Sequence, residues 1–270
     1  MSNITKYLQR YNERPKRLIT YIGVSIIITA IILYSAIGIE YRGVTSRGSN
    51  VAFGIIHGIF NPNTEILFSS AKDAVPYLVL ETIGIAVLGT IIGAIISVPI
   101  AFLGSNLLPP WLSYIFRSLV LGIRTIPSLV WALIWIRVVG PGATCGIITQ
   151  SITSIGMISK LYITAIEDID KNILESLDAV GCNTFEKIRY GIIPQLTASF
   201  ISAAIYRFDI NIKDASVLGI VGAGGIGAPM LNAINSRRWP LVGSFLLVII
   251  IVVIFFEFLS TKIRKKLARG

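Results

Sequence analysis

Four long stretches of this 270-residue chain contain no charged side chain, and short polar segments separate them. They cover residues 18–39, 82–116, 138–159 and 239–256. Because the hydrocarbon core of a bilayer requires about 20 apolar residues per helix, the pattern predicts an all-α integral membrane protein with one membrane domain. We expect six transmembrane helices, at residues 18–38, 77–104, 112–139, 143–165, 194–220 and 240–261.

The composition supports this class of protein. Hydrophobic residues make up 54% of the chain, charged residues 14%, and the mean hydropathy is +0.76, whereas soluble domains carry about 25% charged residues. The net charge of +10 does not indicate nucleic acid as a partner, because basic residues cluster beside the predicted spans. Such clusters are typical of the cytoplasmic side, so we expect both termini in the cytoplasm. The clusters are Lys6, Arg10, Arg14, Lys16 and Arg17, and Lys262, Arg264, Lys265, Lys266 and Arg269.

The order of apolar and polar segments predicts three parts. Residues 1–74 would form an N-terminal cytoplasmic segment, an anchor helix at 18–38 and an outer interfacial segment. The anchor is not expected to be a cleaved signal peptide, because its apolar run is too long and no small-x-small cleavage site follows it. Residues 75–261 would form the transmembrane domain, with a cytoplasmic loop at 166–193, and residues 262–270 a basic cytoplasmic tail.

The polar loop at 166–193 contains signals for two short helices. Asp170 or Asn172 can cap a first helix, and Gly181 can adopt the left-handed conformation that ends it. Asn183 followed by Glu186 three residues later is typical of a capping box. Pro194 can open the next membrane helix, where its missing N–H costs least. We therefore expect two short helices, joined at a glycine, that project from the membrane.

The spacing of Glu175, Gly181 and Pro194 resembles the coupling motif of bacterial ABC importer permeases, although Ser176 and Leu177 replace its two alanines. In that family the coupling helix docks on a separate ATPase subunit. The resemblance implies that the ATPase-coupling residues are Glu175, Asp178, Ala179, Gly181, Phe185 and Pro194.

Three further stretches, at 123–133, 187–195 and 206–227, together resemble the phosphonate ABC-transporter permease family. The resemblance covers residues 75–260 and implies the type I ABC importer permease fold. It also implies a bacterial plasma-membrane complex containing a second copy of this chain, two cytoplasmic ATPase subunits and an extracytoplasmic substrate-binding protein. The chain has no Gly-x4-Gly-Lys-Ser/Thr motif, so ATP and Mg²⁺ would bind to the ATPase, and we expect no cofactor or metal on this chain.

Four charged residues fall in or near predicted spans: Glu81, Arg124, Arg207 and Asp209. A charge within a membrane is costly and therefore indicates a function by default. One interpretation is ion pairing that stabilises the fold, with Arg207 or Asp209 reaching Arg124 or Glu81. The other is that Arg124 lines the pathway and attracts a phosphonate group, since guanidinium suits phosphate-like oxygens.

The glycines Gly222, Gly224, Gly225 and Gly227 match the dinucleotide-binding pattern Gly-x-Gly-x-x-Gly. That function requires a preceding strand and an acidic residue about 20 positions further on. Here the corresponding region is an apolar span, so we reject it. We expect instead a closely packed turn at the outer end of the fifth helix, near an outer gate or hinge.

Two other classes of protein remain as alternatives. A secondary transporter would require ion-coupling carboxylates at mid-membrane and usually more helices. A membrane enzyme would require a catalytic constellation, and the single histidine, His57, removes most such schemes. Among importers, the alternative substrates are another small oxyanion, such as phosphite or a phosphate ester, and an amino acid.

Overall fold

A computed structural model gives the structure of the chain and describes residues 18–38, 46–71 and 73–267. Every regular element in the described part of the chain is a helix. The chain divides into two units, residues 1–51 and 52–270. The first unit contains α2 (Leu18–Ile37), an apolar helix long enough to cross a bilayer. The N-terminal basic cluster and Arg269 of the C-terminal cluster lie outside the described residues.

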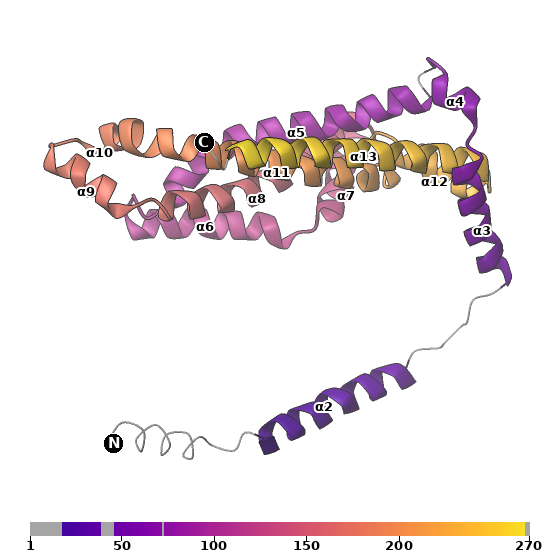
Figure 1. Cartoon of the computed structure of the whole chain (residues 1–270), viewed down its shortest axis with the longest axis horizontal. Helices are drawn as coiled ribbons and strands as arrows, with labels where there is room; N and C mark the ends of the chain where they lie inside the picture. Colours follow the sequence, from indigo (N-terminus) through magenta and orange to yellow (C-terminus); the bar gives the residue numbers. More distant parts are fainter. Residues whose placement is uncertain (1–17, 39–45, 72, 268–270) are drawn as a thin grey trace. The chain divides into compact units, whose positions relative to one another are not determined.

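The second unit is a helical bundle built around α5 (Val75–Gly104), α8 (Ala143–Glu167) and α11 (Ile193–Ile220). α5 packs along α8, α11 packs against both, and α13 (Trp239–Leu267) packs against α11. Figure 1 shows α9 (Lys171–Ala179) and α10 (Thr184–Glu186) at one end of this bundle, and α12 (Gly227–Asn235) at the other.

Small residues allow the close approach of α5 and α8. A Cβ atom on Gly89 would overlap the side chain of Gln150, and one on Gly93 would overlap Ser154. In lipid, helix association depends on packing and interhelical hydrogen bonds rather than on the hydrophobic effect. The glycines of α5 thus bring the polar side chains of α8 into the centre of the bundle.

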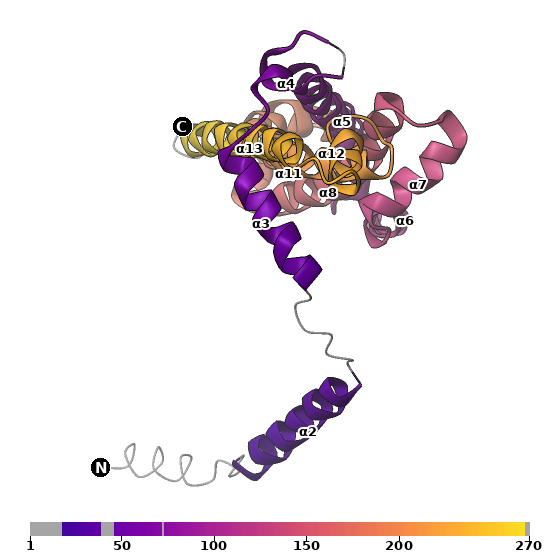
Figure 2. The same ribbon diagram turned by 90° about the vertical axis from the view of Figure 1, so that its right-hand side faces the viewer.

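The predicted helix at 112–139 is wrong as a single element. The chain forms α6 (Pro110–Thr125) and α7 (Ser128–Val139), which meet at an angle of 88°. The break falls at Ile126–Pro127, because proline lacks an N–H and disfavours helical geometry in the residue before it. Figure 2, which looks along the bundle, shows α7 and α13 on opposite sides of it.

Three described helices, α2, α5 and α13, are long and apolar enough to span a membrane, or four if the bent pair α6–α7 counts as one. α8 and α11 have the length of a span but carry buried polar residues. Six spans therefore remain a prediction, although the observed helices match the other predicted ranges closely.

At the end of the bundle that carries α12, short elements pack onto the start of α13. α3 (Ser46–Phe60) contains the predicted interfacial segment, and a Cβ atom on Gly54 would lie 2.7 Å from the indole nitrogen of Trp239. α4 (Thr64–Phe68) is capped by Asn63, whose backbone N–H donates to Ser244 Oγ at 2.8 Å. Between the fifth and sixth predicted spans the chain forms the short helix α12, which was not predicted.

Candidate functional site

The first candidate feature is the polar segment between α8 and α11, which has the predicted local structure. Asp170 caps α9, with its carboxylate accepting from the Asn172 N–H at 3.0 Å. Gly181 has a φ of +84°, the left-handed conformation predicted for the turn. Asn183 and Glu186 form a reciprocal capping box, with distances of 2.8 and 2.9 Å.

The second helix of this segment does not end before the membrane domain. α10 runs into a π-helical turn, Lys187–Ile192, and then directly into α11. The π-turn is closed by the Ile193 N–H, which donates to the Ile188 carbonyl five residues earlier. The prediction of two separate short helices is therefore wrong in this detail, because α10, the π-turn and α11 follow one another as one continuous helix.

Two contacts hold α9 against this continuous helix. Asp178 forms an ion pair with Lys187, and Leu177 packs over Gly191, where a larger residue would overlap it. Every residue predicted to couple to an ATPase has an exposed side chain or backbone, including Phe185 at 68% exposure. The segment thus presents a braced, exposed surface at one end of the bundle; these residues are Glu175, Asp178, Ala179, Gly181, Phe185 and Pro194.

The second candidate feature is a polar network inside the bundle, centred on Arg207 of α11. Arg207 is only 6% exposed and donates to Ser154 Oγ at 3.1 Å and Thr153 Oγ1 at 2.9 Å. Its guanidinium also lies 3.9 Å from a carboxylate oxygen of Asp214. The arginine is therefore paired and hydrogen-bonded, as a charge buried in a membrane protein requires.

Asn211, one turn further along α11, extends the network to α5. Its amide donates to Thr90 Oγ1 and to Ser154 Oγ, both at 2.8 Å, and Gln150 donates to its backbone carbonyl at 3.2 Å. Ser154 Oγ therefore accepts from both Asn211 and Arg207. One hydroxyl of α8 joins the two polar side chains of α11.

A pocket of about 270 Å³ opens beside this network, where α6 breaks into α7. Arg124, Arg207 and Asp214 all line it. Arg124 is exposed, and its stem lies close to Gly156, where a Cβ atom would come within 3.0 Å of it. At about 30 Å³ per water, the pocket has room for several waters or one small anion. Two guanidinium groups and one carboxylate leave it with a net positive charge.

The structure corrects the predicted ion pairs. Within the described residues, neither Arg207 nor Asp209 pairs with Arg124 or Glu81. Asp209 instead pairs with Lys213 at 3.3 Å, and Lys213 reaches Glu257 of α13 at 3.2 Å. Asp214 was not among the predicted residues. It lies seven residues, or two helical turns, after Arg207, and this spacing places both side chains on one face of α11.

The glycine segment is a tight turn between α11 and α12, as predicted. Gly222, Gly224 and Gly225 have φ values of +94°, +84° and +74°. A Cβ atom on Gly225 would lie 2.5 Å from Thr82 Oγ1, and one on Gly224 would lie 3.0 Å from Glu81 Oε1. The Ile226 N–H also donates to Thr82 Oγ1 at 3.1 Å. The preceding element is helical, so the dinucleotide interpretation fails structurally as well.

The long apolar helices, and the buried polar network between the helices of the bundle, are those of a multi-pass membrane protein. The chain belongs to the family described as the binding-protein-dependent transport system inner membrane component, whose model matches residues 89–269. Members of this family are the membrane permease subunits of ABC importers, which confirms the predicted class of protein.

Individual relatives agree with this family. The chain is 35% identical over 190 residues to the phosphate-import permease protein PhnE of Mycolicibacterium smegmatis, covering 70% of this chain but only 36% of that protein. It is 31% identical over 188 residues to the phosphite transport system permease protein PtxC of Stutzerimonas stutzeri, covering 69% of this chain and 68% of PtxC. It is also 39% identical over 110 residues to a protein of Escherichia coli named putative cryptic phosphonate transport system permease protein PhnE2, covering 41% of this chain and 90% of that protein. The predicted resemblance to phosphonate ABC permeases is thereby confirmed.

The fold also matches solved structures. An inward-facing structure of the MetNI methionine ABC transporter aligns with a TM-score of 0.61 at 20% identity, covering 72% of this chain and 95% of that chain. This likeness confirms the type I ABC importer permease fold. The family match, and not the fold, sets aside the alternative of a secondary transporter.

Proposed function

We propose that this chain forms the translocation pathway of an ATP-driven importer for phosphonates. Phosphite, phosphate esters and amino acids are the alternative substrates. The names of three relatives concern phosphate, phosphite and phosphonate, and all three compounds have a tetrahedral phosphorus centre with anionic oxygens. The resemblance of residues 123–133, 187–195 and 206–227 to phosphonate permeases favours this substrate class.

The observation that carries the proposal is the pocket lined by both Arg124 and Arg207. Guanidinium groups bind phosphate-like oxygens through paired N–H donors. Arg207 is held by Thr153, Ser154 and Asp214, so its position is fixed, whereas Arg124 is exposed and has no ion pair within the described residues. Arg207 would maintain the positive potential of the pathway, and Arg124 would contact the passing oxyanion.

The assembly follows the family pattern. We propose a homodimer in the bacterial plasma membrane, surrounded by lipid, with both termini in the cytoplasm. Two cytoplasmic ATPase subunits would bind ATP and Mg²⁺ and dock on the exposed surface formed by Glu175, Asp178, Ala179, Gly181 and Phe185, with Pro194 opening α11 behind it. An extracytoplasmic binding protein would deliver the substrate.

The continuous helix from α10 to α11 supports this coupling. A movement of the docked segment would pass along one helix to Arg207, with no loop between them. At the opposite end of α11, the turn formed by Gly222, Gly224 and Gly225, with Gly227 at the start of α12, would act as the outer gate or hinge. Its close contacts with α5 and α8 make any gate movement there a shift of packed elements rather than of a loose loop.

The test is ATP-dependent uptake of radiolabelled methylphosphonate, phosphite and phosphate into proteoliposomes that contain the reconstituted complex. Arg124→Gln should lower phosphonate uptake at least tenfold while dimer and ATPase assembly stay intact, since one charge-assisted contact is worth about 1.5–3 kcal/mol. Arg124→Lys should retain part of the activity. Arg137→Gln changes an exposed arginine of α7 outside the pocket and serves as the matched control.

Two results would contradict the proposal. If Arg124→Gln abolished assembly, the arginine would serve the fold rather than the pathway. If Arg124→Gln transported as well as Arg137→Gln, the pocket would have no part in moving the anion.

A further inference from the structure

One side of α3 presents a row of exposed apolar side chains. Phe53, Ile56 and Phe60 are 71%, 54% and 80% exposed. Because successive residues of an α-helix are about 100° apart, these three side chains lie within about 60° of one another around the helix axis. We call them the exposed apolar face of α3. The proposed transport mechanism does not involve this face.

The far side of α3 is fixed against the start of α13. A Cβ atom on Gly58 would overlap the backbone carbonyl of Trp239, and one on Gly243 would overlap the carbonyl of Gly58. The two helix backbones therefore touch where they cross, as small residues allow. Gly54 and Gly58 lie about 150° around the axis of α3 from the middle of the exposed apolar face. The crossing thus holds that face away from the bundle.

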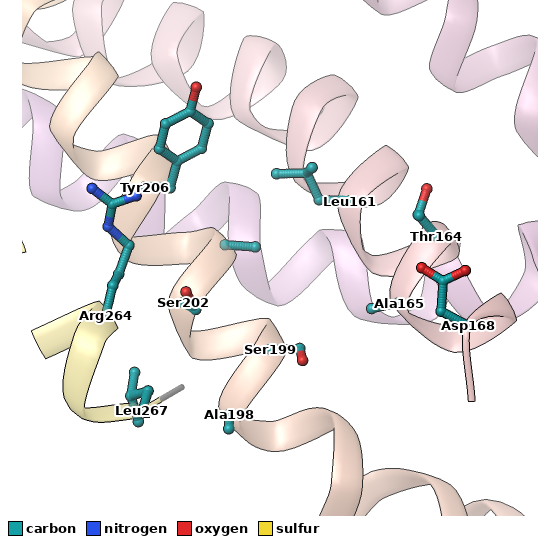
Figure 3. A pocket seen from close by; sticks show the side chains of 11 residues that line it. Leu161, Thr164, Ala165, Asp168, Ala198, Ser199, Ser202, Tyr206, Arg264 and Leu267 are labelled. Atoms are coloured by element: carbon teal, nitrogen blue, oxygen red, sulfur yellow. The ribbon is translucent and has the colours of Figure 1, made fainter. Parts of the chain in front are cut away.

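The crossing lies at the end of a membrane span. The uncharged run of α13 begins at Trp239, directly after the exposed basic pair at 237–238. The helix ends in a second basic cluster, and Figure 3 shows its Arg264 beside Tyr206 of α11. Basic residues and tryptophan gather where a span meets the lipid headgroups. α3 crosses at Trp239 and Gly243, so it lies level with the first turn of the span.

The direction of α3 suits this level. Figures 1 and 2 both show α3 running across the end of the bundle, whereas α13 runs along it. Residues 52–60 of α3 belong to the same unit as the bundle. A helix that crosses a membrane span in this way lies close to the plane of the membrane.

The two flanks of the exposed apolar face differ in polarity. On one flank His57 and Asn61 are exposed, and their side-chain nitrogens lie 3.3 Å apart. On the other flank Ile55 and Ile59 are half-buried. Apolar residues thus continue from the half-buried flank to the exposed apolar face, and one polar edge remains. This order is typical of a helix that lies in the membrane interface with its polar edge towards water.

We propose that the exposed apolar face of α3 lies in lipid, with Phe53, Ile56 and Phe60 among the first acyl carbons of the outer leaflet. A helix of this kind buries its apolar side about 5–10 Å into the boundary between headgroups and acyl chains. The crossing occupies about one helical turn of α13, or about 5.4 Å, starting at Trp239, which matches this depth. A binding protein that approaches from the water would instead require an apolar face beyond the end of the span.

The structure adds two points to the sequence prediction of an interfacial segment. It identifies the side of the helix that meets lipid, and it identifies the glycine crossing that holds the helix in place. α3 would therefore tie the start of α13 to the membrane surface. The lipid contact depends on the membrane domain and not on the transported substrate. Only the choice of leaflet depends on the proposed position of the termini.

The experiment is photocrosslinking of the full chain, reconstituted with its partner subunits and the binding protein in phospholipid vesicles. p-Benzoylphenylalanine replaces Phe60 in one preparation and Phe53 in another, and the illuminated protein is analysed by intact mass spectrometry. Benzophenone inserts into nearby C–H bonds, so a probe among acyl chains should give a mass increase of one phospholipid. An adduct with a second copy or with the binding protein would appear at a much larger mass.

Two controls separate lipid contact from exposure alone. Phe185 is 68% exposed in the segment at the other end of the bundle, and the same probe there should give no lipid adduct. The probe in place of His57, on the polar edge, should give fewer lipid adducts than the probe in place of Phe60.

A further variant, His57→Cys, tests the leaflet. In intact cells, a membrane-impermeant maleimide added outside should label the new cysteine but not Cys182, which lies between α9 and α10. Labelling of Cys182 alone would overturn the outer-leaflet assignment without affecting the crosslinking result.

The crosslinking outcomes point in opposite directions. Lipid adducts from Phe53 and Phe60 but not from Phe185 would support the proposal. A crosslink from Phe60 to a second copy or to the binding protein, without lipid, would overturn it and identify the exposed apolar face as a protein interface. Equal lipid adducts from Phe60 and His57 would overturn the proposed orientation of α3.

Discussion

Ser154 of α8 is the point at which the internal polar network can be tested most cleanly. Its side chain is fully buried, and its hydroxyl accepts from Arg207 Nε at 3.1 Å and from Asn211 Nδ2 at 2.8 Å. Ser154→Ala removes one oxygen atom and introduces no larger group. The variant therefore deletes two interhelical hydrogen bonds with little change in packing.

The expected magnitude follows from these two bonds. Interhelical hydrogen bonds in membrane proteins contribute about 0.6 kcal/mol on average and up to about 1.7 kcal/mol each. Losing two should lower the free energy of unfolding by about 1–3 kcal/mol, with the larger values favoured because the Arg207 donor is charged. Part of the cost is that two buried donors lose an acceptor.

The assay is reversible unfolding in mixed lipid–SDS micelles, followed by tryptophan fluorescence. Ser118→Ala, at an exposed serine of α6, should change stability by less than about 0.5 kcal/mol. In a double-mutant cycle, Ser154→Ala and Asn211→Ala should couple by about 0.6–1.7 kcal/mol, because they share one bond. A Ser154→Ala loss equal to that of Ser118→Ala, or full additivity in the cycle, would refute the network as described.

Two glycine positions provide further predictions. Gly181→Val should abolish co-purification of an ATPase subunit from solubilised membranes while Gly181→Asn retains it, because asparagine tolerates a φ of +84° and a β-branched residue does not; equal recovery with both variants would contradict a role for this turn. Gly225→Ala should lower the free energy of unfolding by about 2–4 kcal/mol, from left-handed strain and the contact with Thr82, whereas Gly84→Ala, with open space around its Cβ, should not. Equal stabilities of these two variants in the same SDS titration would show that the turn is not tightly packed.

The polar segment between α8 and α11 was the part of the fold most open to prediction, because its structure depends on residues that are near neighbours in sequence. The cap at Asp170, the capping box from Asn183 to Glu186 and the left-handed turn at Gly181 each involve residues at most three positions apart. The sequence also contained the break between α6 and α7, in Pro127. The length of residues 112–139, which suits one span, concealed it, even though Arg117, Arg124 and Arg137 interrupt the apolar residues there.

The candidate pocket was predictable only in part. Arg124 and Arg207 were identified from their charges alone, but the partners of Arg207 on α8 lie more than 50 residues away. Whether Ser154 meets Arg207 depends on how closely α5, α8 and α11 approach, which no local pattern encodes. Asp214 could have been found, because residues seven apart share a helix face.

The π-helical turn at Lys187–Ile192 lies between α10 and α11, so it fixes the direction in which α9 and α10 point around the axis of α11. A π-helical turn contains one residue more than an α-helical turn, because its hydrogen bond joins residues five positions apart rather than four. Removing one residue from this turn would allow a regular α-helix, but it would rotate everything before it by about 100° around the axis of α11. Phe185 and the α9 surface would then face a different direction relative to Arg207. Under the proposed coupling, the length of this turn, more than its composition, would therefore decide whether an ATPase docked on α9 is aligned with Arg207.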